Sequence, residues 1–484
     1  MNLYKIINQL TDEEYNELHS SLVATQALKT ISFLECIKED PISPDKLFLE
    51  REDVNAAAFY VLKSRLADRI EDFLLQRLGG DTLALTHRVL TVSDLVFDST
   101  REIAEAALGK LEKELIKNDF PYGLMLVYKE LQNVHNFGEE HAYYKRRYQQ
   151  QVAYAVAMDK AEDLVREFFK VFDEYELKRR DRDLTTLTRI MEKLSNLSDL
   201  YDSHRLYFCK GIVHLFALLF IEIPDTIRCD LEPAEDIMEK LVKIQDDFKD
   251  DPTYRRLDLI VNFLRYSLDE NKGRQDNSHL RYGILDDAIE KLLTGFHFNI
   301  NASLFLFAKL RHHIRNKSIS QLRKQVDGYV GKIPVDTYRV TYFLNYNLFK
   351  AYALFLDGDY HAASRVLFDL QNEVNLRNDR RAMLNVKLLQ IICYVKMEDF
   401  DLANAAILAM QRKLRQTTFE KWENAKTFLR IMNVALGGRP KTMEKNLRSS
   451  IDKWNEENKG AVALLEYLDL DVVFNMKTKV LQHS

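Results

Sequence analysis

The chain has 484 residues, of which 46% are hydrophobic and 30% charged, and it contains only 15 glycines and 8 prolines. This composition excludes an intrinsically disordered protein, and so few helix-breaking residues favour long helices joined by short turns. Lys and Arg number 69 against 74 Asp and Glu, a formal net charge of −5, which argues against a general nucleic-acid-binding protein but leaves room for a local basic surface.

Residues 1–80 predict a small helical unit of their own. Thr11-Asp12-Glu13-Glu14 has the form of a capping box and predicts a helix through about residue 22. Apolar residues at three- or four-residue spacing predict a long amphipathic helix within residues 51–80, which Gly79-Gly80 ends. The opening residues lack the pattern of a signal peptide, so we expect a cytoplasmic protein.

Residues 81–484 predict a body of helical repeats. Segment 99–134 predicts two helices, with Pro121 at the first position of the second helix, where its missing N–H does no harm. The most apolar window, residues 211–224, is too short to span a bilayer and predicts a buried helix with a hydrogen-bonded core histidine, His214. We therefore expect no membrane association. The polar residues near 270–280 are the best candidate for a flexible break in the body.

A short acidic-aromatic pattern occurs twice in the last third of the chain, at an interval of forty residues. Gly358-Asp359-Tyr360 is followed by Ala363, and Glu398-Asp399-Phe400 is followed by Ala403. A third, degenerate copy begins at Gly438. Apolar residues keep the same offsets in all three copies: Ala351, Ile391 and Ile431; Leu354, Tyr394 and Val434; Leu367, Ile407 and Leu447. A small residue early in a second helix lets a hairpin close tightly, and such hairpins bury their apolar faces by stacking.

This pattern resembles the tetratricopeptide repeat, in which an aromatic residue lies late in the first helix and a small residue early in the second. The resemblance covers residues 343–455 well and 99–134 weakly, with Gly123 at the small position. It implies an all-α, right-handed α-α solenoid of helical hairpins that binds proteins or peptides. The period of forty exceeds the about 34 residues of that family and also suits HEAT repeats, which remain the alternative fold.

Tyrosine and asparagine residues in segment 337–355 predict a peptide-binding surface. Tyr338, Tyr342 and Tyr346 are spaced by four residues and would follow one stripe of a helix. Asparagine can bond a peptide backbone in both directions, and tyrosine offers contact area and a hydroxyl. The predicted partner-binding residues are Tyr338, Arg339, Tyr342, Asn345, Tyr346 and Lys350. The alternative for these aromatic residues is core packing between repeats.

Two basic groups predict a site for an anionic partner. They are Lys145, Arg146 and Arg147, and Lys178, Arg179 and Arg180, which the sequence places within one helical pair. Nearby tyrosines would permit stacking against nucleic-acid bases. Acidic residues flank both runs, so a solvated, salt-bridged helix face is the alternative.

No linear catalytic, phosphate-binding or metal-binding motif is present. The four cysteines form no C-x-x-C pair, and His312 and His313 are adjacent and would point about 100° apart on a helix, a poor geometry for chelation. We expect no enzyme activity, no metal and no cofactor. The expected function is a non-enzymatic scaffold or adaptor for a protein or peptide, and the alternative is a nucleic-acid-associated or peptide-gated regulator that uses the basic helices. The sequence leaves the partner and the oligomeric state open.

Overall fold

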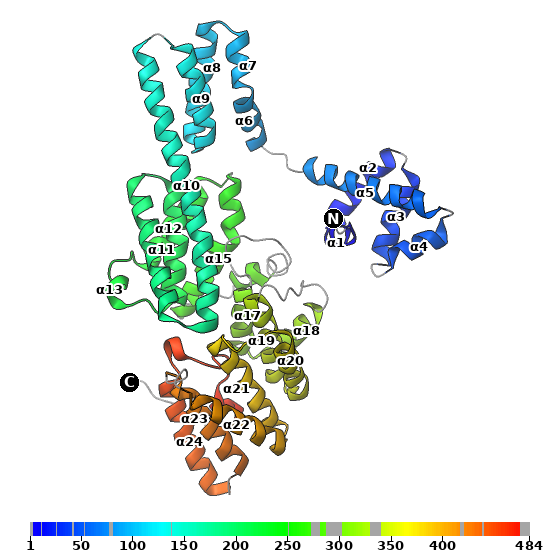
Figure 1. The fold of residues 1–484 in the computed structure, drawn as a ribbon, viewed down its shortest axis with the longest axis vertical. Coiled ribbons are helices and arrows are strands. Elements are labelled where there is room, and N and C mark those ends of the chain that lie inside the picture. Colours follow the sequence, from blue (N-terminus) through cyan, green and yellow to red (C-terminus); the bar gives the residue numbers. More distant parts are fainter. Residues whose placement is uncertain are drawn as a thin grey trace. The chain divides into compact units, whose positions relative to one another are not determined.

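The structure is a computed structural model that describes residues 3–474 apart from several gaps. The gaps are residues 11, 26, 41–42, 53, 77–80, 137, 250, 273–280, 287–302, 330–339, 417–420 and 438–439. Every element in the described residues is a helix, so the predicted all-α class is confirmed (Figure 1). The chain divides into two compact units, Met1–Tyr148 and Gln149–Ser484, here called unit 1 and unit 2.

The first part of unit 1 is a group of helices around one hydrophobic cluster, in which the rings of Phe33, Phe48 and Phe59 touch one another. The helices are α1 (Leu3–Gln9), α2 (Asp12–Ala24), α3 (Leu28–Glu39), α4 (Pro44–Arg51) and α5 (Ala56–Gln76). The long helix expected within 51–80 begins only at Ala56. The side chain of Asn55 accepts a hydrogen bond from the Ala58 amide at 2.8 Å and starts a new helix there. Thr11 and Gly79-Gly80 lie outside the described residues.

The rest of unit 1 surrounds a separate hydrophobic cluster. Its helices are α6 (Asp81–Leu90), α7 (Val92–Asp98), α8 (Arg101–Lys117), α9 (Pro121–Val134) and the first turns of α10 (Glu139–Lys178). The two helices predicted in 99–134 are confirmed, with Pro121 as the first residue of α9. A Cβ added to Gly123 would lie 2.7 Å from a methyl carbon of Leu115 on α8. Glycine at this position therefore allows α8 and α9 to pack closely. The domain boundary predicted at residue 80 falls, in sequence, between the two hydrophobic clusters of unit 1.

Unit 2 is built around one continuous hydrophobic cluster that includes residues from Tyr154 to Leu470. After α10 its helices are α11 (Asp181–Leu200), α12 (His204–Phe220), α13 (Asp225–Arg228), α14 (Ala234–Asp247), α15 (Pro252–Asn271), α17 (Ser303–Arg315), α18 (Ile319–Tyr329), α19 (Val340–Leu356), α20 (Tyr360–Glu373), α21 (Arg380–Lys396), α22 (Phe400–Leu414), α23 (Glu423–Gly437), α24 (Pro440–Glu457) and α25 (Leu470–Val473). Part of the predicted break near 270–280 lies outside the described residues.

The repeated acidic-aromatic pattern forms the turns of two helical hairpins. Gly358 and Glu398 adopt positive φ angles of 88° and 58°. The amides of Asp359 and Asp399 return to the carbonyls of Leu354 and Tyr394, at 3.0 and 3.1 Å, which is the Schellman arrangement. Each aspartate then caps the next helix, because Asp359 accepts from the Ala362 amide at 3.0 Å and Asp399 accepts from the Leu402 amide at 3.1 Å. The pattern thus ends one helix and starts the next within three residues.

The helices that these turns connect pack as successive hairpins. In Figure 1, α19–α20, α21–α22 and α23–α24 follow one another, and α21 contacts both α19 and α23. Ala363 and Ala403 are 0% exposed, as close packing of the hairpins requires. The aromatic positions differ, because Tyr360 packs against Phe355 at 5.1 Å between ring centres whereas Phe400 is 52% exposed. The two turns therefore share their backbone hydrogen bonds but not the packing of the aromatic residue.

The predicted buried helix in the apolar window is the central helix α12. It contacts α11, α14 and α15. His214 is 2% exposed, and its Nε2 lies 3.3 Å from the Ser195 hydroxyl and 3.4 Å from the Met191 carbonyl. The predicted hydrogen-bonded core histidine is confirmed. Burial disfavours the imidazolium form and lowers the pKa of His214 from 6.5 to about 4.

We expect this histidine to make unit 2 less stable in acid. Because the pKa of His214 is lower in the folded than in the unfolded protein, the unfolded state binds the proton first, and stability is lost as pH falls from about 6.5 towards about 4. Between pH 7.5 and 5 the loss from this group is about 2 kcal/mol. The wild type and His214→Gln are each unfolded with urea at both pH values. The contribution of His214 is the difference between the stability that the two proteins lose from the higher to the lower pH. Equal losses would contradict the assignment.

Among the described residues, no helix is long and apolar enough to cross a bilayer. The four cysteines are all free: Cys36 and Cys393 are buried, Cys209 is partly buried and Cys229 is exposed.

Candidate functional site

The predicted tyrosine–asparagine surface belongs to α19, and its residues differ in environment. Tyr346 is 7% exposed and lies in the hydrophobic core, and Tyr342 packs against that core. Lys350 is half-buried and forms no ion pair with any residue that the structure describes. Asn345 lines a cavity inside unit 2. Two of the six predicted residues lie outside the described residues: Tyr338 and Arg339. Binding of a peptide to this surface stays a prediction.

The first predicted basic group belongs to unit 1, in the early turns of α10. Lys145 and Arg146 are exposed. Arg147 is half-buried, and its guanidinium donates a hydrogen bond to the Tyr128 hydroxyl at 3.1 Å and lies 5.5 Å from the centre of that ring. Arg147 therefore packs against α9, and the other two residues present their charges to solvent.

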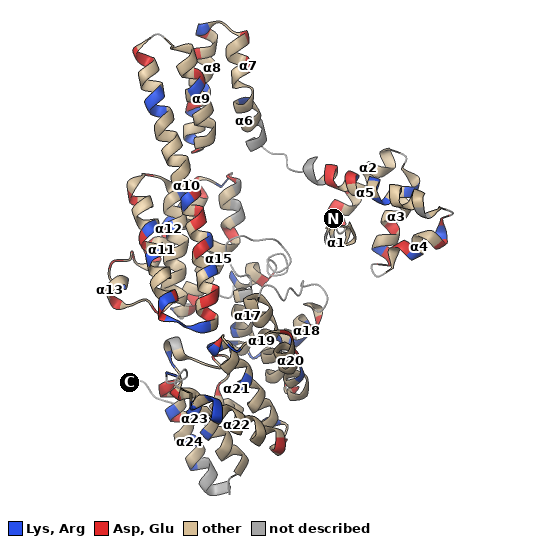
Figure 2. Ribbon diagram, viewed as in Figure 1, with Lys and Arg blue, Asp and Glu red and all other residues tan. Residues whose placement is uncertain are grey.

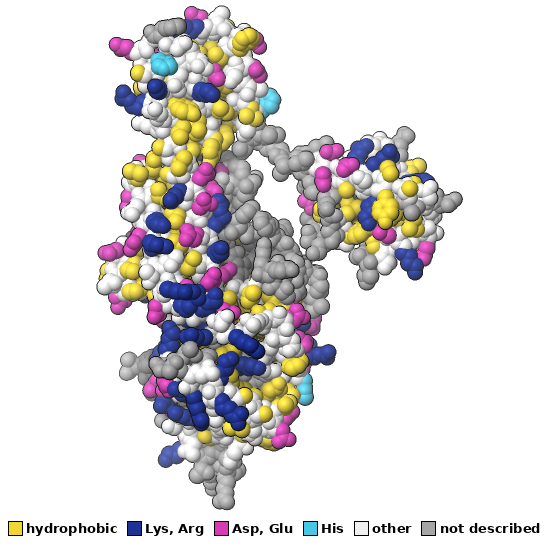
Figure 3. Space-filling view, in the orientation of Figure 1, with side chains coloured by type: hydrophobic (Ala, Val, Ile, Leu, Met, Phe, Trp, Pro, Cys, Tyr) yellow, Lys and Arg dark blue, Asp and Glu magenta, His cyan; other side chains and the backbone are white. Residues whose placement is uncertain are grey.

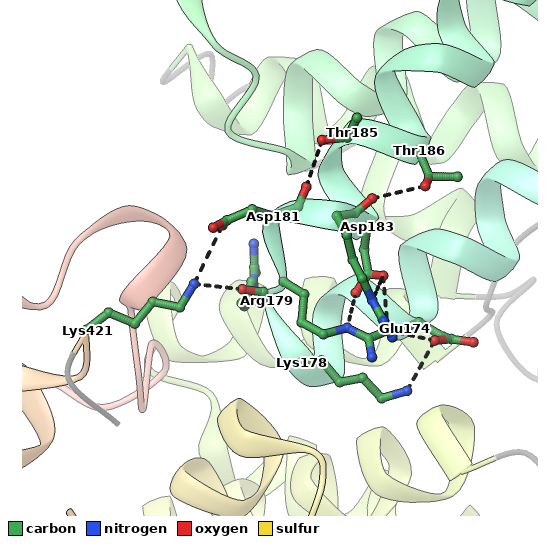
Figure 4. A network of polar contacts seen from close by, with 10 residues as sticks. Glu174, Lys178, Arg179, Asp181, Asp183, Thr185, Thr186 and Lys421 are labelled. Carbon is green, nitrogen blue, oxygen red and sulfur yellow. Dashed lines mark hydrogen bonds and ion pairs between the residues drawn. The ribbon is translucent and has the colours of Figure 1, made fainter. Parts of the chain in front are cut away.

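The second predicted basic group lies in unit 2, where α10 ends and α11 begins. Figure 4 shows it inside a network of acidic side chains. The Lys178 ammonium lies 3.1 Å from Glu174, and the Arg180 guanidinium bridges Glu174 at 3.0 Å and Asp183 at 2.7 Å. These pairs hold the pKa of the Glu174 carboxyl below its usual range, with the hydrogen bond from Lys178 as the largest cause. This is the salt-bridged arrangement that the sequence left as the alternative.

Arg179, between these two residues, is 9% exposed. Its φ angle is 49°, in the left-handed region. This backbone conformation ends α10, and the guanidinium forms an ion pair with Glu176 at 2.6 Å. The Arg179 carbonyl accepts a hydrogen bond from Lys421 at 3.1 Å (Figure 4). Arg179 therefore faces the interior of unit 2, where it lines the same cavity as Asn345.

A larger basic surface extends from the second group across the repeats. Three hollows of about 390, 470 and 510 Å³ open on it. Their described lining includes nine Lys and Arg side chains and no Asp or Glu. These nine residues define the basic face: Lys178, Arg180, Arg377, Arg380, Lys387, Lys413, Arg415, Lys426 and Arg430.

The three hollows are neighbours, because residues adjacent in sequence line consecutive ones. Arg377 lines one hollow, and Asn378 lines the next. Lys413 and Leu414, at the end of α22, likewise line two different hollows. Figure 3 shows Lys and Arg side chains gathered over α21–α24 and the junction of α10 and α11, and Figure 2 shows the same basic positions on the ribbon. Consecutive hollows are thus linked through neighbouring residues of the chain.

Most of the positive charge on the basic face is uncompensated. Lys178, Arg180 and Lys426 form ion pairs with neighbouring carboxylates. The other six form no ion pair with any described residue: Arg377, Arg380, Lys387, Lys413, Arg415 and Arg430. In a chain with a formal net charge of −5, this is a local concentration of positive charge. Such a concentration attracts an anionic partner.

The lining of the hollows also offers hydrogen bonds to a peptide backbone. Side-chain amides lie beside the cations, among them Gln371, Asn372 and Asn375 in the hollow between α20, α21 and α22. Aliphatic side chains line the same hollow, including Val374 and Met383. Amides both donate to and accept from a backbone, and aliphatic side chains provide apolar contact. The surface therefore combines positive charge, paired hydrogen-bonding groups and apolar area.

Lys387 illustrates the electrostatic effect of this clustering. Its side chain is half-buried on α21. Burial lowers the pKa of Lys387, and repulsion from the Lys413 ammonium lowers it further. An anionic group bound between the two lysines would relieve that repulsion.

Most of the basic face was missed in the sequence because its residues come from four helices and the turns beside them. The run Lys178-Arg179-Arg180 was predicted as a basic group, and the run Arg412-Lys413-Leu414-Arg415 was a second local signal that could have indicated the face. The remaining cations of the face meet these runs only in the folded unit.

No group of three or more His, Cys, Asp or Glu side chains in the described part of the chain is arranged to hold a metal ion. Comparison of the chain with family models, with curated proteins and with solved structures finds no match.

Proposed function

We propose that the protein is a non-enzymatic scaffold whose unit 2 binds an acidic, extended segment of a partner protein on the basic face. The single observation that carries this proposal is the set of three adjoining hollows lined by nine cations and no carboxylate. Six of these cations have no ion-pair partner among the described residues. Carboxylates of a partner would supply the missing pairs.

A peptide fits the lining better than a nucleic acid does. The side-chain amides of Asn372 and Asn375 suit a peptide backbone, and the aliphatic side chains beside them suit apolar partner residues. The Gln371 amide already donates to the Leu367 carbonyl and to Gln390. The described lining of the three hollows contains no aromatic side chain on which a base could stack. Binding of a nucleic acid by phosphate contacts alone is the second candidate, and the positive charge itself favours it.

The consecutive hairpins α19–α24 support the view that this part of unit 2 is a tetratricopeptide-like, right-handed solenoid. The closely packed alanines Ala363 and Ala403 and the two matching turns are its basis. The period of forty residues keeps HEAT-like hairpins as the alternative. In either geometry, residues at equivalent positions of successive hairpins would form an extended surface for a peptide.

Charge reversal on the basic face should abolish most of this binding. A dye-labelled peptide of Glu and Leu, about 12 residues long, is titrated with the full chain and followed by fluorescence anisotropy. We expect the Kd to rise at least about tenfold in Arg377→Glu/Lys387→Glu, because two cations become anions beside the bound carboxylates. A matched peptide of Gln and Leu should bind at least about tenfold more weakly than the acidic one.

The matched control is Lys170→Glu/Lys193→Glu, which changes the net charge equally at two exposed lysines of unit 2 away from the hollows. This variant should keep the wild-type Kd. Equal weakening in both double variants would show a general charge effect and contradict the proposal. A DNA duplex that displaces the acidic peptide, with a steeper dependence on salt, would favour the nucleic-acid candidate instead.

A further inference from the structure

The cavity lined by Asn345 and Arg179 has a polar wall and an apolar wall. Its volume is about 150 Å³, and α10, α12, α17, α19, α21 and the segment before α25 enclose it. The polar residues of the lining include Arg311, Tyr352 and Tyr467, and the apolar ones include Phe307, Leu344 and Leu348. The described residues that line this cavity belong to unit 2, and none of them lines a hollow of the basic face.

Several polar groups of this cavity have no partner among the described residues. Arg311 forms no hydrogen bond and no ion pair there, and the hydroxyls of Tyr352 and Tyr467 form no hydrogen bond there. The Arg179 side chain is 9% exposed, and its buried Nε also lacks a hydrogen-bond partner. Of these groups the Arg179 Nε is buried, and a buried polar group without a partner is costly. Arg311 and Tyr467 are half-buried and line the cavity, so an acceptor bound there would reach them.

The charges of the wall indicate that this acceptor is an anion. Three arginines line the cavity, Arg179, Arg311 and Arg381, against two glutamates. Both glutamates are already engaged, because Arg381 pairs with Glu176 at 2.7 Å and with Glu466 at 2.5 Å. Arg311 is therefore the arginine of this lining that forms no ion pair with a described residue.

The tyrosine hydroxyls act as donors in this setting. Burial raises the pKa of Tyr352 and of Tyr467, so both keep their protons at neutral pH. The two rings are in edge contact, 5.4 Å between centres, and both residues line the cavity.

The apolar wall and the volume limit the rest of the ligand. A cavity of about 150 Å³ with apolar walls accommodates a molecule the size of benzene. Phe307 stacks on Tyr467 at 5.0 Å between ring centres and fixes one side of this wall.

We propose that the cavity binds a small organic acid, with its carboxylate on Arg311 and the hydroxyls of Tyr352 and Tyr467 and its apolar body against Phe307 and Leu344. Arginine binds a carboxylate through two parallel hydrogen bonds, and the tyrosines add further donors. An inorganic phosphate is also negatively charged, but it has no apolar body that would contact Phe307 and Leu344. This inference does not depend on the docking of an acidic protein segment.

Benzoate is the probe, with benzamide as its neutral analogue and inorganic phosphate as the anion without an apolar body. Isothermal titration calorimetry of the full chain should show one benzoate bound per chain. Benzamide should bind at least about tenfold more weakly, and so should phosphate. Benzoate should also raise the midpoint of thermal unfolding of unit 2, because it binds only the folded state.

Arg311→Gln should raise the Kd for benzoate at least about tenfold, and circular dichroism should show an unchanged helix content because Arg311 has no structural partner. Leu344→Phe fills the cavity and keeps every arginine, and it should raise the Kd for benzoate by a similar factor. Arg189→Gln, at an exposed arginine of α11, should leave the Kd unchanged. Absence of binding at about 10 mM, corresponding to less than about 3 kcal/mol of binding free energy, would overturn the proposal. Equal binding to the wild type and Arg311→Gln would overturn it too, and so would phosphate that binds as tightly as benzoate.

Discussion

Replacement of Arg381 by methionine should lower the free energy of unfolding of unit 2 by about 3 kcal/mol. The Arg381 side chain is 10% exposed and connects α21 to Glu176 of α10 and to Glu466 near the end of the described chain. Its Nε also donates to the Ala463 carbonyl at 3.4 Å. Methionine fills much of the same space but leaves both carboxylates without this partner, and a partly buried charge without its partner is strongly destabilising.

Both tryptophans of the chain, Trp422 and Trp454, lie in unit 2, so tryptophan fluorescence during urea unfolding reports this unit specifically. The double variant Arg381→Met/Glu466→Gln should recover part of the loss, because it removes the carboxylate that Arg381→Met leaves unpaired, whereas Glu176 keeps its ion pair with Arg179. The matched control, Arg365→Met at an exposed position of α20, should change stability by less than about 0.5 kcal/mol. Similar losses in Arg381→Met and Arg365→Met would show that the buried ion pairs do not stabilise unit 2.

Replacement of Phe216 by alanine should lower the stability of unit 2 by about 4 kcal/mol. Phe216 is 0% exposed on α12, and its ring centre lies 4.9 Å from that of Phe169 and 4.8 Å from that of Phe172. Both contacts are edge-on, the arrangement in which aromatic pairs attract beyond simple burial. The variant therefore loses buried apolar area, leaves a cavity and removes the contact between α12 and α10.

The matched control is Phe368→Ala, since Phe368 is 56% exposed on α20. This substitution should lower the free energy of unfolding by less than about 0.5 kcal/mol in the same urea experiment. A loss at Phe216 no larger than at Phe368 would mean that α12 is not the central helix of the core. In that case the edge-on aromatic contacts between α10 and α12 would not stabilise unit 2.

The features that could be predicted from the sequence are those that depend on neighbouring residues. Pro121 begins α9, Ala363 and Ala403 are fully buried, and the apolar window forms α12. In each case the physical cause lies within a turn or two of helix: a fixed φ angle, a small side chain or an apolar stripe. The break before Ala56 was missed because Asn55 is one ordinary-looking cap without a glycine or proline beside it.

The candidate sites were only partly predictable. Lys178 and Arg180 were predicted to meet an anion, and the structure surrounds them with Glu174 and Asp183. Asn345 was predicted to contact a peptide, and it lines the interior cavity instead of a described surface hollow. Their roles in binding remain predictions for the experiments above.

The sequence by itself determined that the chain is helical, where many of its turns fall and which helix faces are apolar, because these properties follow from local periodicity and turn chemistry. Only the tertiary structure decided which charged groups are paired and which are not. The cations of the basic face come from four helices and the turns beside them, and the cavity brings Arg179, Arg311 and Tyr467 together from distant parts of the chain. Side-chain pairing depends on the packing of whole helices against each other, and no local pattern specifies that packing.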